Sequence, residues 1–256
     1  MQDIKIVSFN VNGLINPNKR GRILSKLRKD KVQIAYLQET HLSDVEHAKL
    51  NKSGFKHVYS SSYKSGPRRG VAILISRTVN YEHISEIKDK EGRFILIIGK
   101  IEGTIVSLLN VYAPPGSDWS FYKQIFHIMV TKSQGILLNA GDYNFRLKPH
   151  LDASGGNPEP TPIAKKVTSL MKEVGIVDVW REMYPTSRDY THYSAPHSVY
   201  SRLDYAFVFN RDFHKIKQCN IGPIALSDHS PVYMTICLNG KMRSTLWRFN
   251  SKQSNN

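Results

Sequence analysis

Residues 137–145 read LLNAGDYNF, an apolar run that ends in Gly141, Asp142 and Asn144. Such a run, stopping at a polar turn, is typical of a buried strand whose last side chains reach the edge of a sheet. Gly141 permits a close backbone approach, and the spacing of Asp142 and Asn144 places both on one face. The stretch predicts either a functional cluster at a strand end or a simple turn rich in Asp and Asn.

Apolar runs of the same kind recur along the chain and indicate a large system of strands. They are IKIVSF, VQIAYL, GVAILI, RFILIIG, TIVSLLNVY, GILLNA, LDYAFV and PVYMTICL. Between them, residues 22–29, 119–130 and 162–174 have apolar side chains at helical spacing. Asp118 is placed to cap the second of these helices, and Gly175 to end the third. The sequence therefore predicts an α/β fold in which helices and strands alternate.

The chain is strongly basic, with 36 Lys and Arg against 21 Asp and Glu and a formal net charge of +15. This excess favours a polyanionic partner such as nucleic acid over a basic surface that only keeps the chain soluble. No apolar run approaches the ~18 residues of a membrane span, and the first residues do not resemble a signal peptide, so we expect no secretion. Cys219 and Cys237 are too few for a disulfide framework and lack zinc-site spacing, so we expect reduced core thiols, with a lone disulfide as the alternative.

Pro and Gly fall in short clusters between the apolar runs, and no internal repeat is present. A chain of this length can bury one sizeable core, so we expect one domain over residues 1–239. Residues 240–256 turn polar and basic and end in SKQSNN, which predicts a tail or a linker stub. This ending also indicates a piece of a longer polypeptide.

Polar residues stand at the ends of other predicted strands as well. Asn10 and Asn12 occur in SFNVNGL, and Glu39 follows the apolar part of IAYLQETHL, where a carboxylate suits a hard cation such as Mg²⁺. Tyr112 ends a strand before a Pro-Pro turn, where its hydroxyl is placed to meet a phosphate. Alone, each is equally well explained by a turn, a solvated carboxylate or a packed tyrosine.

The segment ALSDHSPVYM places Ser227, Asp228 and His229 just before the last predicted strand. Histidine is the side chain whose ordinary pKa lies nearest neutrality. Because neighbouring residues on a strand point apart, a distant acid is expected to orient His229. Asp204, inside the apolar run SRLDYAFV, is the candidate for that acid, with a buried structural ion pair as the alternative.

In chain order these segments read SFNVNGL, QETHL, NVYAP, GDYN, RLDY and SDHSP. The series resembles the exonuclease-endonuclease-phosphatase family of DNase I-like and apurinic endonucleases, over nearly the whole chain. Within that family, NVNGL, QETHL, GVAILIS, NVYAP, THYSAPH and LSDHSPV look most like the endonuclease domain of LINE retrotransposons. The resemblance implies a four-layer α/β sandwich of two facing mixed β-sheets flanked by helices, with the active site at one edge.

The resemblance also implies roles for the residues in these motifs. Glu39 would hold a Mg²⁺ ion, for which Mn²⁺ would substitute. Asn10 would assist Glu39 as a metal residue, and Asp228 would complete the carboxylate cluster on the metal side. Asp142 and Asn144 would position and activate the attacking water.

On the phosphate side, Tyr112 would contact the scissile phosphate, and His229 would act there as an acid, a base or an electrostatic group. Asp204 would orient His229. Asp142 and His229 are both candidates for the general base, because coupled titrations do not assign a proton to one residue. Apurinic repair enzymes usually carry Asp where this chain has Asn12, which speaks against a second metal carboxylate.

Residues 190–202 are similar to a segment that faces DNA in the LINE endonucleases. They predict a hairpin that probes the minor groove and reads its shape, with a plain surface hairpin as the alternative. The residues expected to contact DNA, on this segment and in SDHSP, are Thr191, His197, Tyr200, Arg202 and Ser227.

The implied function is an endonuclease that nicks one strand of double-stranded DNA and leaves a 3′-hydroxyl to prime reverse transcription. A reverse transcriptase is then expected in the same polypeptide. We expect the isolated domain to be a monomer and to act in the nucleus after synthesis in the cytoplasm. The alternatives are an apurinic/apyrimidinic repair endonuclease, a DNA-binding module whose catalysis has decayed and, with less support, a phosphodiesterase for inositol phosphates or sphingomyelin.

Overall fold

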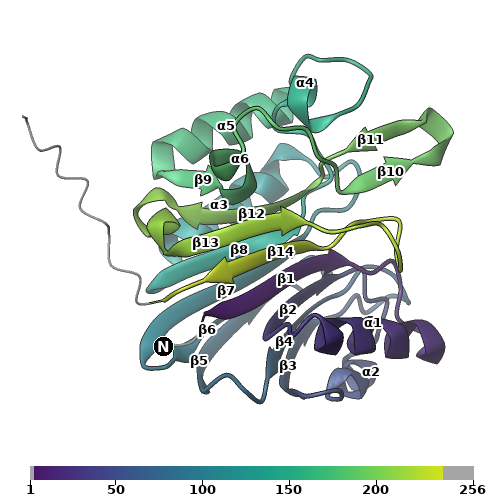
Figure 1. Ribbon diagram of the computed structural model, residues 1–256, viewed down its shortest axis with the longest axis vertical. Helices are drawn as coiled ribbons and strands as arrows, with labels where there is room; N and C mark the ends of the chain where they lie inside the picture. Colours follow the sequence, from purple (N-terminus) through teal and green to yellow (C-terminus); the bar gives the residue numbers. More distant parts are fainter. Residues whose placement is uncertain (1–2, 239–256) are drawn as a thin grey trace, which may run out of the picture.

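The computed structural model describes residues 3–238, in which two β-sheets pack face to face (Figure 1). The strands of the first sheet are β1 (Ile4–Asn10), β2 (Ile34–Gln38), β3 (Phe55–Ser61), β4 (Val71–Ser76), β13 (Ile216–Ile221) and β14 (Val232–Ile236). Those of the second are β5 (Tyr81–Lys88), β6 (Phe94–Ile101), β7 (Thr104–Tyr112), β8 (Ile136–Asp142), β9 (Ile176–Asp178) and β12 (Asp204–Phe209). A separate hairpin consists of β10 (His192–Ser194) and β11 (Val199–Ser201).

Helices cover the outer faces of both sheets (Figure 1). The α-helices are α1 (Pro17–Lys29), α2 (Asp44–His47), α3 (Trp119–Thr131), α4 (Pro149–Asp152), α5 (Pro162–Val174) and α6 (Val179–Met183). Short 3₁₀ helices are η1 (Ala48–Leu50), η2 (Ala195–His197) and η3 (Asn210–Lys215). Helix α1 packs on the first sheet, and α3 and α5 pack on the second. The expected four-layer sandwich of two mixed sheets is thus confirmed.

The interior strands of each sheet are buried on both faces, which explains the continuous apolar runs of the sequence. In β2, Ile34 and Tyr36 enter the core between the sheets, whereas Ala35 and Leu37 face the helix side. The Tyr36 hydroxyl crosses the core and donates to the backbone carbonyl of Leu138 in the second sheet, at 3.0 Å. The alternation of side chains along one strand therefore supplies two layers of core at once.

The strand order of the two sheets shows why some strands were missed from the sequence. It is β13-β14-β1-β2-β4-β3 in the first sheet and β5-β6-β7-β8-β12-β9 in the second. The eight predicted strands correspond to β1, β2, β4, β6, β7, β8, β12 and β14, which are the interior strands. The missed strands, β3, β5, β9 and β13, are the four sheet edges. An edge strand has one unpaired side and more polar, exposed residues, so it lacks an apolar run.

Two of the three predicted helices were placed correctly. Helix α3 begins after Asp118, whose side chain accepts from the backbone N–H of Phe121, and α5 ends at Gly175 with φ of 69°. Helix α1 instead begins at Pro17, earlier than predicted, because its first turn is polar and has no apolar periodicity. Asn16 caps that turn by accepting from two backbone N–H groups.

The cysteines, possible membrane spans and the C-terminal tail were also predicted from the sequence. Cys219 and Cys237 are free thiols, as expected. Among residues 3–238, no helix is both long enough and apolar enough to cross a membrane. The predicted tail, residues 240–256, lies outside the described residues.

Candidate active site

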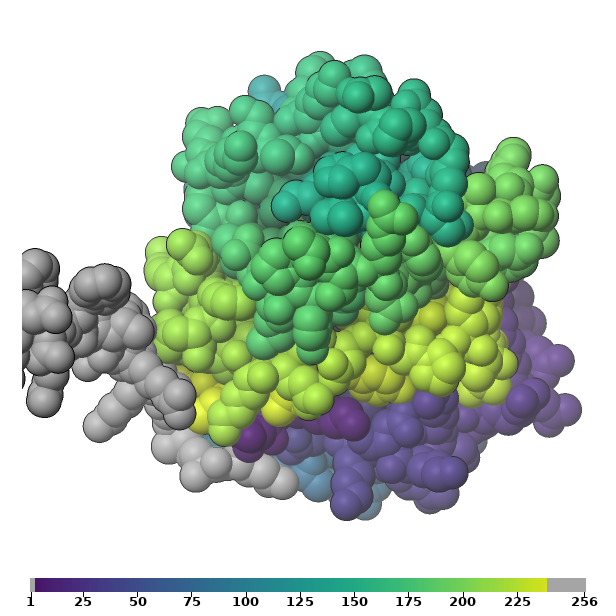
Figure 2. Space-filling model, turned by 45° about the horizontal axis from the view of Figure 1, so that its top comes forward, coloured from purple at the N-terminus to yellow at the C-terminus, as the bar shows by residue number. Residues whose placement is uncertain are grey.

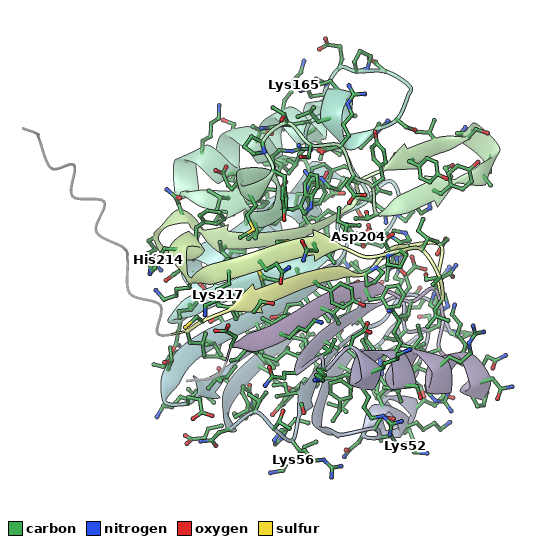
Figure 3. All side chains as sticks on the ribbon, in the orientation of Figure 1. Lys52, Lys56, Lys165, Asp204, His214 and Lys217 are labelled. Atoms are coloured by element: carbon green, nitrogen blue, oxygen red, sulfur yellow. The ribbon has the colours of Figure 1, made fainter. Side chains whose placement is uncertain are left out.

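The predicted catalytic residues gather where six strands meet at one end of the sandwich. Strands β1 and β2 run parallel and end there, as do β7 and β8, while the antiparallel β12 and β14 begin there. Register pairs Asp204 with Asp142, and Figure 3 labels Asp204 at this edge, where β12 begins. The residues brought to this end are Asn10, Glu39, Tyr112, Asp142, Asn144, Asp204, Asp228 and His229.

Asn10 joins the two sheets at the centre of the site. It is wholly buried, and its Nδ2 donates to Oε1 of Glu39 and to Oδ2 of Asp142, both at 2.9 Å. Its Oδ1 accepts from the backbone N–H of Asn12 at 3.0 Å. The Asn10 amide therefore sets the spacing of two carboxylates from opposite sheets, and a direct metal contact by Asn10 stays a prediction.

Several non-glycine residues at this end have left-handed backbone conformations. They include Asn12, Glu39, His41 and Asn144, with φ of 44°, 51°, 55° and 50°. Such a conformation costs on the order of 1–3 kcal/mol and persists only where the surroundings impose it. The backbone N–H of Gly13 helps to hold Glu39 in place by donating to the Glu39 carbonyl at 2.7 Å. Strain of this kind gathers at functional sites.

The Glu39 carboxylate is ionised and partly open to solvent. Burial opposes its charge, but hydrogen bonds from His41, Asn10 and Tyr112 outweigh burial and lower the pKa of Glu39. The His41 Nε2 lies 3.3 Å from Oε2 of Glu39, and the Glu39 side chain keeps 22% of its surface exposed. An accessible, ionised carboxylate is the oxygen ligand that a hard divalent cation prefers, so this residue fits Mg²⁺.

His229 is charged and fixed by Asp204. Its Nδ1 donates to Oδ2 of Asp204 at 2.8 Å, and both side chains are buried. Burial disfavours the imidazolium, but the negative charges of Asp204 and Asp142 prevail and raise the pKa of His229 to about 10. This pairing leaves the Nε2 of His229 facing Asp142, whose Oδ2 lies 3.9 Å away.

Asp142 is a buried carboxylate that is held by an amide. The Nδ2 of Asn144 donates to its Oδ2 at 3.0 Å, and the backbone N–H of Asn144 donates to its Oδ1 at 2.9 Å. Burial, followed by the charge of Asp204, raises the pKa of Asp142 to about 7. A carboxylate of this basicity can take a proton from water near neutral pH.

Gly141 is required for the close approach expected from its sequence. A Cβ at this position would lie 1.9 Å from the carbonyl oxygen of Val111 on the neighbouring strand β7. Only glycine therefore lets β7 and β8 run together up to Asp142.

Asp228 stands at the open rim of the site. Its Oδ1 accepts from Nδ2 of Asn12 at 3.2 Å and from Oγ of Ser227 at 3.0 Å. Burial opposes its charge, but the positive charge of His229 and the hydrogen bonds from Ser227 and Asn12 together outweigh burial and lower the pKa of Asp228. The Lys19 ammonium donates to the carbonyl of Asn12 at 2.7 Å. Two residues at this end were not predicted from the sequence. Lys19 was missed because it lies in the polar first turn of α1. His41 was missed although it stands two residues after Glu39.

The structure contradicts two of the predicted DNA contacts. Arg202 is only 1% exposed and forms ion pairs with Asp152 at 3.0 Å and Asp178 at 2.7 Å. Thr191 is fully buried, and its Oγ1 accepts from the backbone N–H of Asp204 at 3.1 Å. Both side chains hold the base of the hairpin instead of contacting a ligand, so their assignment to DNA binding was wrong.

The predicted hairpin itself is present and projects from the body of the protein (Figures 1 and 2). His197 lies exposed at its tip, and Tyr200 is 45% exposed with its ring centroid 4.5 Å from that of Tyr193. DNA contact by His197, Tyr200 and Ser227 stays a prediction.

Two groups of described residues have the geometry to hold a metal ion. One is Asp142, Asp204 and His229, and the other is His192, Asp228 and His229. In each group the ligand atoms lie within 4.8 Å of one another. In the first group, Oδ2 of Asp204 and Nδ1 of His229 are already hydrogen-bonded to each other. The second group opens to solvent through the exposed Asp228.

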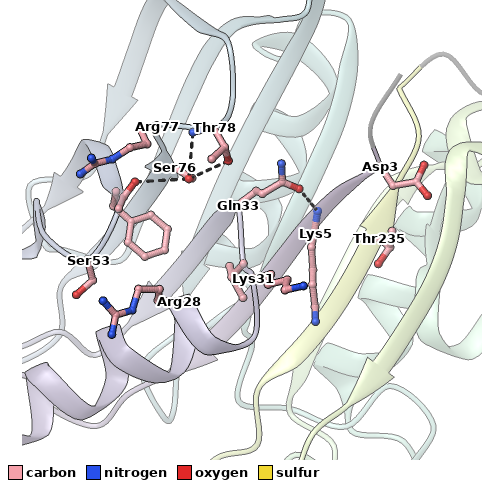
Figure 4. Close-up of a pocket in the computed structure, with 13 residues that line it drawn as sticks. Asp3, Lys5, Arg28, Lys31, Gln33, Ser53, Ser76, Arg77, Thr78 and Thr235 are labelled. Atoms are coloured by element: carbon pink, nitrogen blue, oxygen red, sulfur yellow. Dashed lines mark hydrogen bonds between the residues drawn. The ribbon is translucent and has the colours of Figure 1, made fainter.

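A cavity of about 950 Å³ lies at the opposite end of the first sheet (Figure 4). Its walls include Lys5 at the start of β1, Gln33 before β2 and Ser76 at the end of β4. Asp3, the acidic residue among those lining it, is paired with Lys217 at 2.8 Å. This cavity has no carboxylate and histidine pair, so the chemistry belongs to the other end.

The same end of the sandwich carries motifs spread along most of the sequence, and residues 7–229 match the Endonuclease/Exonuclease/phosphatase family. The chain belongs to this family. The buried Asp204–His229 pair and the linked carboxylates Glu39 and Asp142 are therefore the candidate active site of an endonuclease/exonuclease/phosphatase protein.

Two known proteins are similar to this chain over nearly its whole length. A transposon TX1 149 kDa protein of Xenopus laevis is 27% identical over 97% of this chain, which spans 19% of that protein. An exodeoxyribonuclease of Bacillus subtilis is 24% identical over 91% of this chain and 99% of its own length. The expected kinship with a retrotransposon protein is thus confirmed as similarity to a transposon protein.

Solved structures confirm the expected fold of the family. An AP endonuclease from Archaeoglobus fulgidus superposes with a TM-score of 0.71 and 24% identity over 91% of this chain and 99% of that one. The AP endonuclease LMAP from Leishmania major gives 0.73 and 18% identity over 91% of this chain and 87% of that one. At these identities the likeness establishes the two-sheet sandwich.

Proposed function

We propose that this chain is a divalent-metal-dependent endonuclease that nicks one strand of double-stranded DNA. The observation that carries the proposal is the geometry around Asp142. This basic carboxylate lies between the Asn10–Glu39 pair on one side and the Asp204–His229 pair on the other. Phosphodiester hydrolysis needs an acceptor for the proton of water next to groups that neutralise the phosphate.

The proposed mechanism divides the work among residues of the two sheets. Asp142 accepts the proton of the attacking water, which Asn144 helps to orient. The imidazolium of His229 donates from Nε2 to a phosphate oxygen, and Asp204 keeps that imidazolium charged. Glu39, with Asp228 at the rim, would hold Mg²⁺ or Mn²⁺, which supplies positive charge against the growing charge on the phosphate and the leaving oxygen.

The Tyr112 hydroxyl completes the proposed phosphate site. Burial, and then the charges of Glu39 and Asp142, raise the pKa of Tyr112 above its ordinary range. The hydroxyl therefore keeps its proton, which it donates to Glu39 here and can donate to a phosphate oxygen when the substrate binds.

DNA is the proposed substrate for three reasons. The net charge of +15 favours a polyanion, the hairpin exposes tyrosine rings beside the site, and the transposon relative covers nearly all of this chain. From the similarity to the transposon protein, we also propose that the 3′-hydroxyl left at the nick primes reverse transcription in the nucleus. We propose further that residues 1–239 act as one domain, monomeric when isolated, of a longer polypeptide that includes a reverse transcriptase.

A second candidate is an endonuclease for abasic sites. The similarity in fold to two AP endonucleases supports it. Asn12 speaks against it, because repair enzymes usually carry a carboxylate at this position. In this chain the Asn12 amide donates to Asp228 instead. Cleavage of an intact duplex at a rate equal to or above that of a matched abasic duplex would favour the first candidate.

The deciding experiment follows supercoiled plasmid on a gel. We expect conversion to open circles with Mg²⁺, none with EDTA, and a loss of roughly 10³-fold or more for Asp142→Asn and His229→Asn. Asp212→Asn, a buried carboxylate in η3 away from the site, is the matched control and should cut normally. Retained DNA binding without cleavage by the wild type would identify a decayed DNA-binding module instead.

A further inference from the structure

His192 on the hairpin lies directly against the catalytic histidine candidate. The backbones of His192 and His229 form an isolated antiparallel bridge, and their ring centroids are 4.6 Å apart at an interplanar angle of 46°. Asp228 adjoins both, and one ligand atom from each of the three residues lies within 4.8 Å of the others. The hairpin thus brings a second imidazole to the rim of the active site.

We propose that His192, Asp228 and His229 form a second metal site, selective for a transition-metal ion of the Zn²⁺ class, and that an ion bound there blocks the nuclease. The binding site stands on its own geometry, whereas the blocking of cleavage rests on the proposed function. Nothing in the proposed reaction requires His192.

This site shares Asp228 with the proposed Mg²⁺ site at Glu39 and differs from it by its two imidazole ligands. Zn²⁺ binds imidazole nitrogen and carboxylate oxygen at ~2.0–2.2 Å in four-coordinate geometry, so three protein ligands leave one position for water. Mg²⁺ prefers an octahedron of oxygen atoms and is poorly served by two imidazoles. The ligand atoms lie within 4.8 Å of one another, so a bound ion would draw them together.

The surroundings of His229 already have the form of a metal-binding histidine. Its Nδ1 donates to the Asp204 carboxylate at 2.8 Å, which leaves Nε2 as the atom available to a ligand. A carboxylate on the second ring nitrogen fixes the ring and makes the first nitrogen a stronger ligand.

The other two ligands are ready and accessible. His192 is half-buried, and its ring lies beside that of His229 at the rim. Asp228 is exposed, and its Oδ1 is occupied by Asn12 and Ser227, which leaves Oδ2 for an ion. An ion at this place would take the Nε2 of His229 that the proposed mechanism needs for phosphate.

The first test measures binding without DNA or cleavage. Untagged, EDTA-stripped protein is titrated with Zn²⁺ in a calorimeter and with Co²⁺ by visible absorption, in millimolar Mg²⁺. We expect one Zn²⁺ per chain at this site and a four-coordinate Co²⁺ spectrum. Absence of a saturable Zn²⁺ site in the wild type would overturn the proposal.

Matched variants locate the site. His192→Phe keeps a ring of similar size and should weaken Zn²⁺ binding at least tenfold and abolish the Co²⁺ spectrum. His192→Gln tests the same point if the first variant fails to fold. His197→Phe, on the exposed tip of the same hairpin, should bind as the wild type does. Equal Zn²⁺ affinity in a folded His192 variant would refute the assignment.

The second test concerns inhibition. Plasmid nicking in Mg²⁺ by the wild type should fall at Zn²⁺ concentrations that fill the site, and His192→Phe should resist at least tenfold more Zn²⁺. Equal sensitivity of the two proteins would show that inhibition does not come from this site. If no nicking occurs in Mg²⁺ at all, the proposed function fails, while the Co²⁺ spectra still decide the metal site.

Discussion

Asp204 determines the protonation state of the site through one short contact. Its carboxylate lies 2.8 Å from Nδ1 of His229 and provides the largest charge that raises the pKa of that histidine. The same negative charge is the main electrostatic cause of the raised pKa of Asp142. One residue therefore raises the pKa of both the expected proton acceptor and the expected phosphate donor.

The pH profile of nicking should show both groups. For the wild type, kcat/KM should rise as Asp142 ionises near pH 7 and fall as His229 loses its proton near pH 10. Asp204→Asn removes the charge that raises both pKa values, so both limbs should move to lower pH. Initial rates from pH 5.5 to 10.5 check this, with Asp212→Asn as the control. Limbs that stay in place in Asp204→Asn would contradict the assignment.

At the scale of elements, a buried ionic cluster fastens the hairpin to the second sheet. Arg202, between β11 and β12, contacts Asp152 of α4 and Asp178 of β9, and Arg181 of α6 contacts Asp152 at 2.6 Å. Thr191 holds the other side of the hairpin base through the backbone of Asp204. The arrangement sets the position of the hairpin relative to the catalytic pair.

Loss of Arg202 should therefore destabilise the protein. Arg202→Met leaves two buried carboxylates poorly paired, which typically costs ~3–5 kcal/mol. We expect that loss in the free energy of unfolding by urea, and no more than ~0.5 kcal/mol for the exposed control Arg211→Met. A Met variant as stable as the wild type but weak in DNA binding would restore the original assignment of Arg202 to DNA contact.

The exposed rings of the hairpin should contribute to DNA binding. Tyr193 and Tyr200 pair across the two strands, and stacking on a base is worth ~1–3 kcal/mol per ring. The double change to Ser should weaken binding of a nicking-inactive Asp142→Asn protein at least tenfold, measured by fluorescence anisotropy. Val130→Ser, an exposed residue of α3, is the control. Unchanged affinity would show that the hairpin is a plain surface feature.

At the scale of the whole molecule, net charge should control the encounter with DNA. Each phosphate neutralised contributes about −0.9 to the slope of log K against log salt, so six contacts predict a loss of ~10³ in affinity from 50 to 200 mM salt. Anisotropy titrations of Asp142→Asn with a short duplex measure the slope. An affinity that is indifferent to salt would exclude the proposed electrostatic contact.

The interior of the fold could be read from the sequence, but its edges could not. Interior strands are buried on two faces, so each has an apolar run that can be recognised without knowing which strands pair with it. Strand β5, at an edge, has five consecutive exposed residues and shows no such run. The first turn of α1 was not predicted for the same reason, because it has neither buried residues nor apolar periodicity.

The sequence by itself determined the family, the two-sheet sandwich and the set of polar residues that end its strands, because strand ends and motif order are local properties of the chain. The roles of Thr191, Arg202 and His192 were decided only by tertiary structure. Burial and ion pairing depend on partners far away in the chain, such as Asp152 for Arg202 and His229 for His192. No local pattern distinguishes an arginine that reaches DNA from one that closes a buried ion pair.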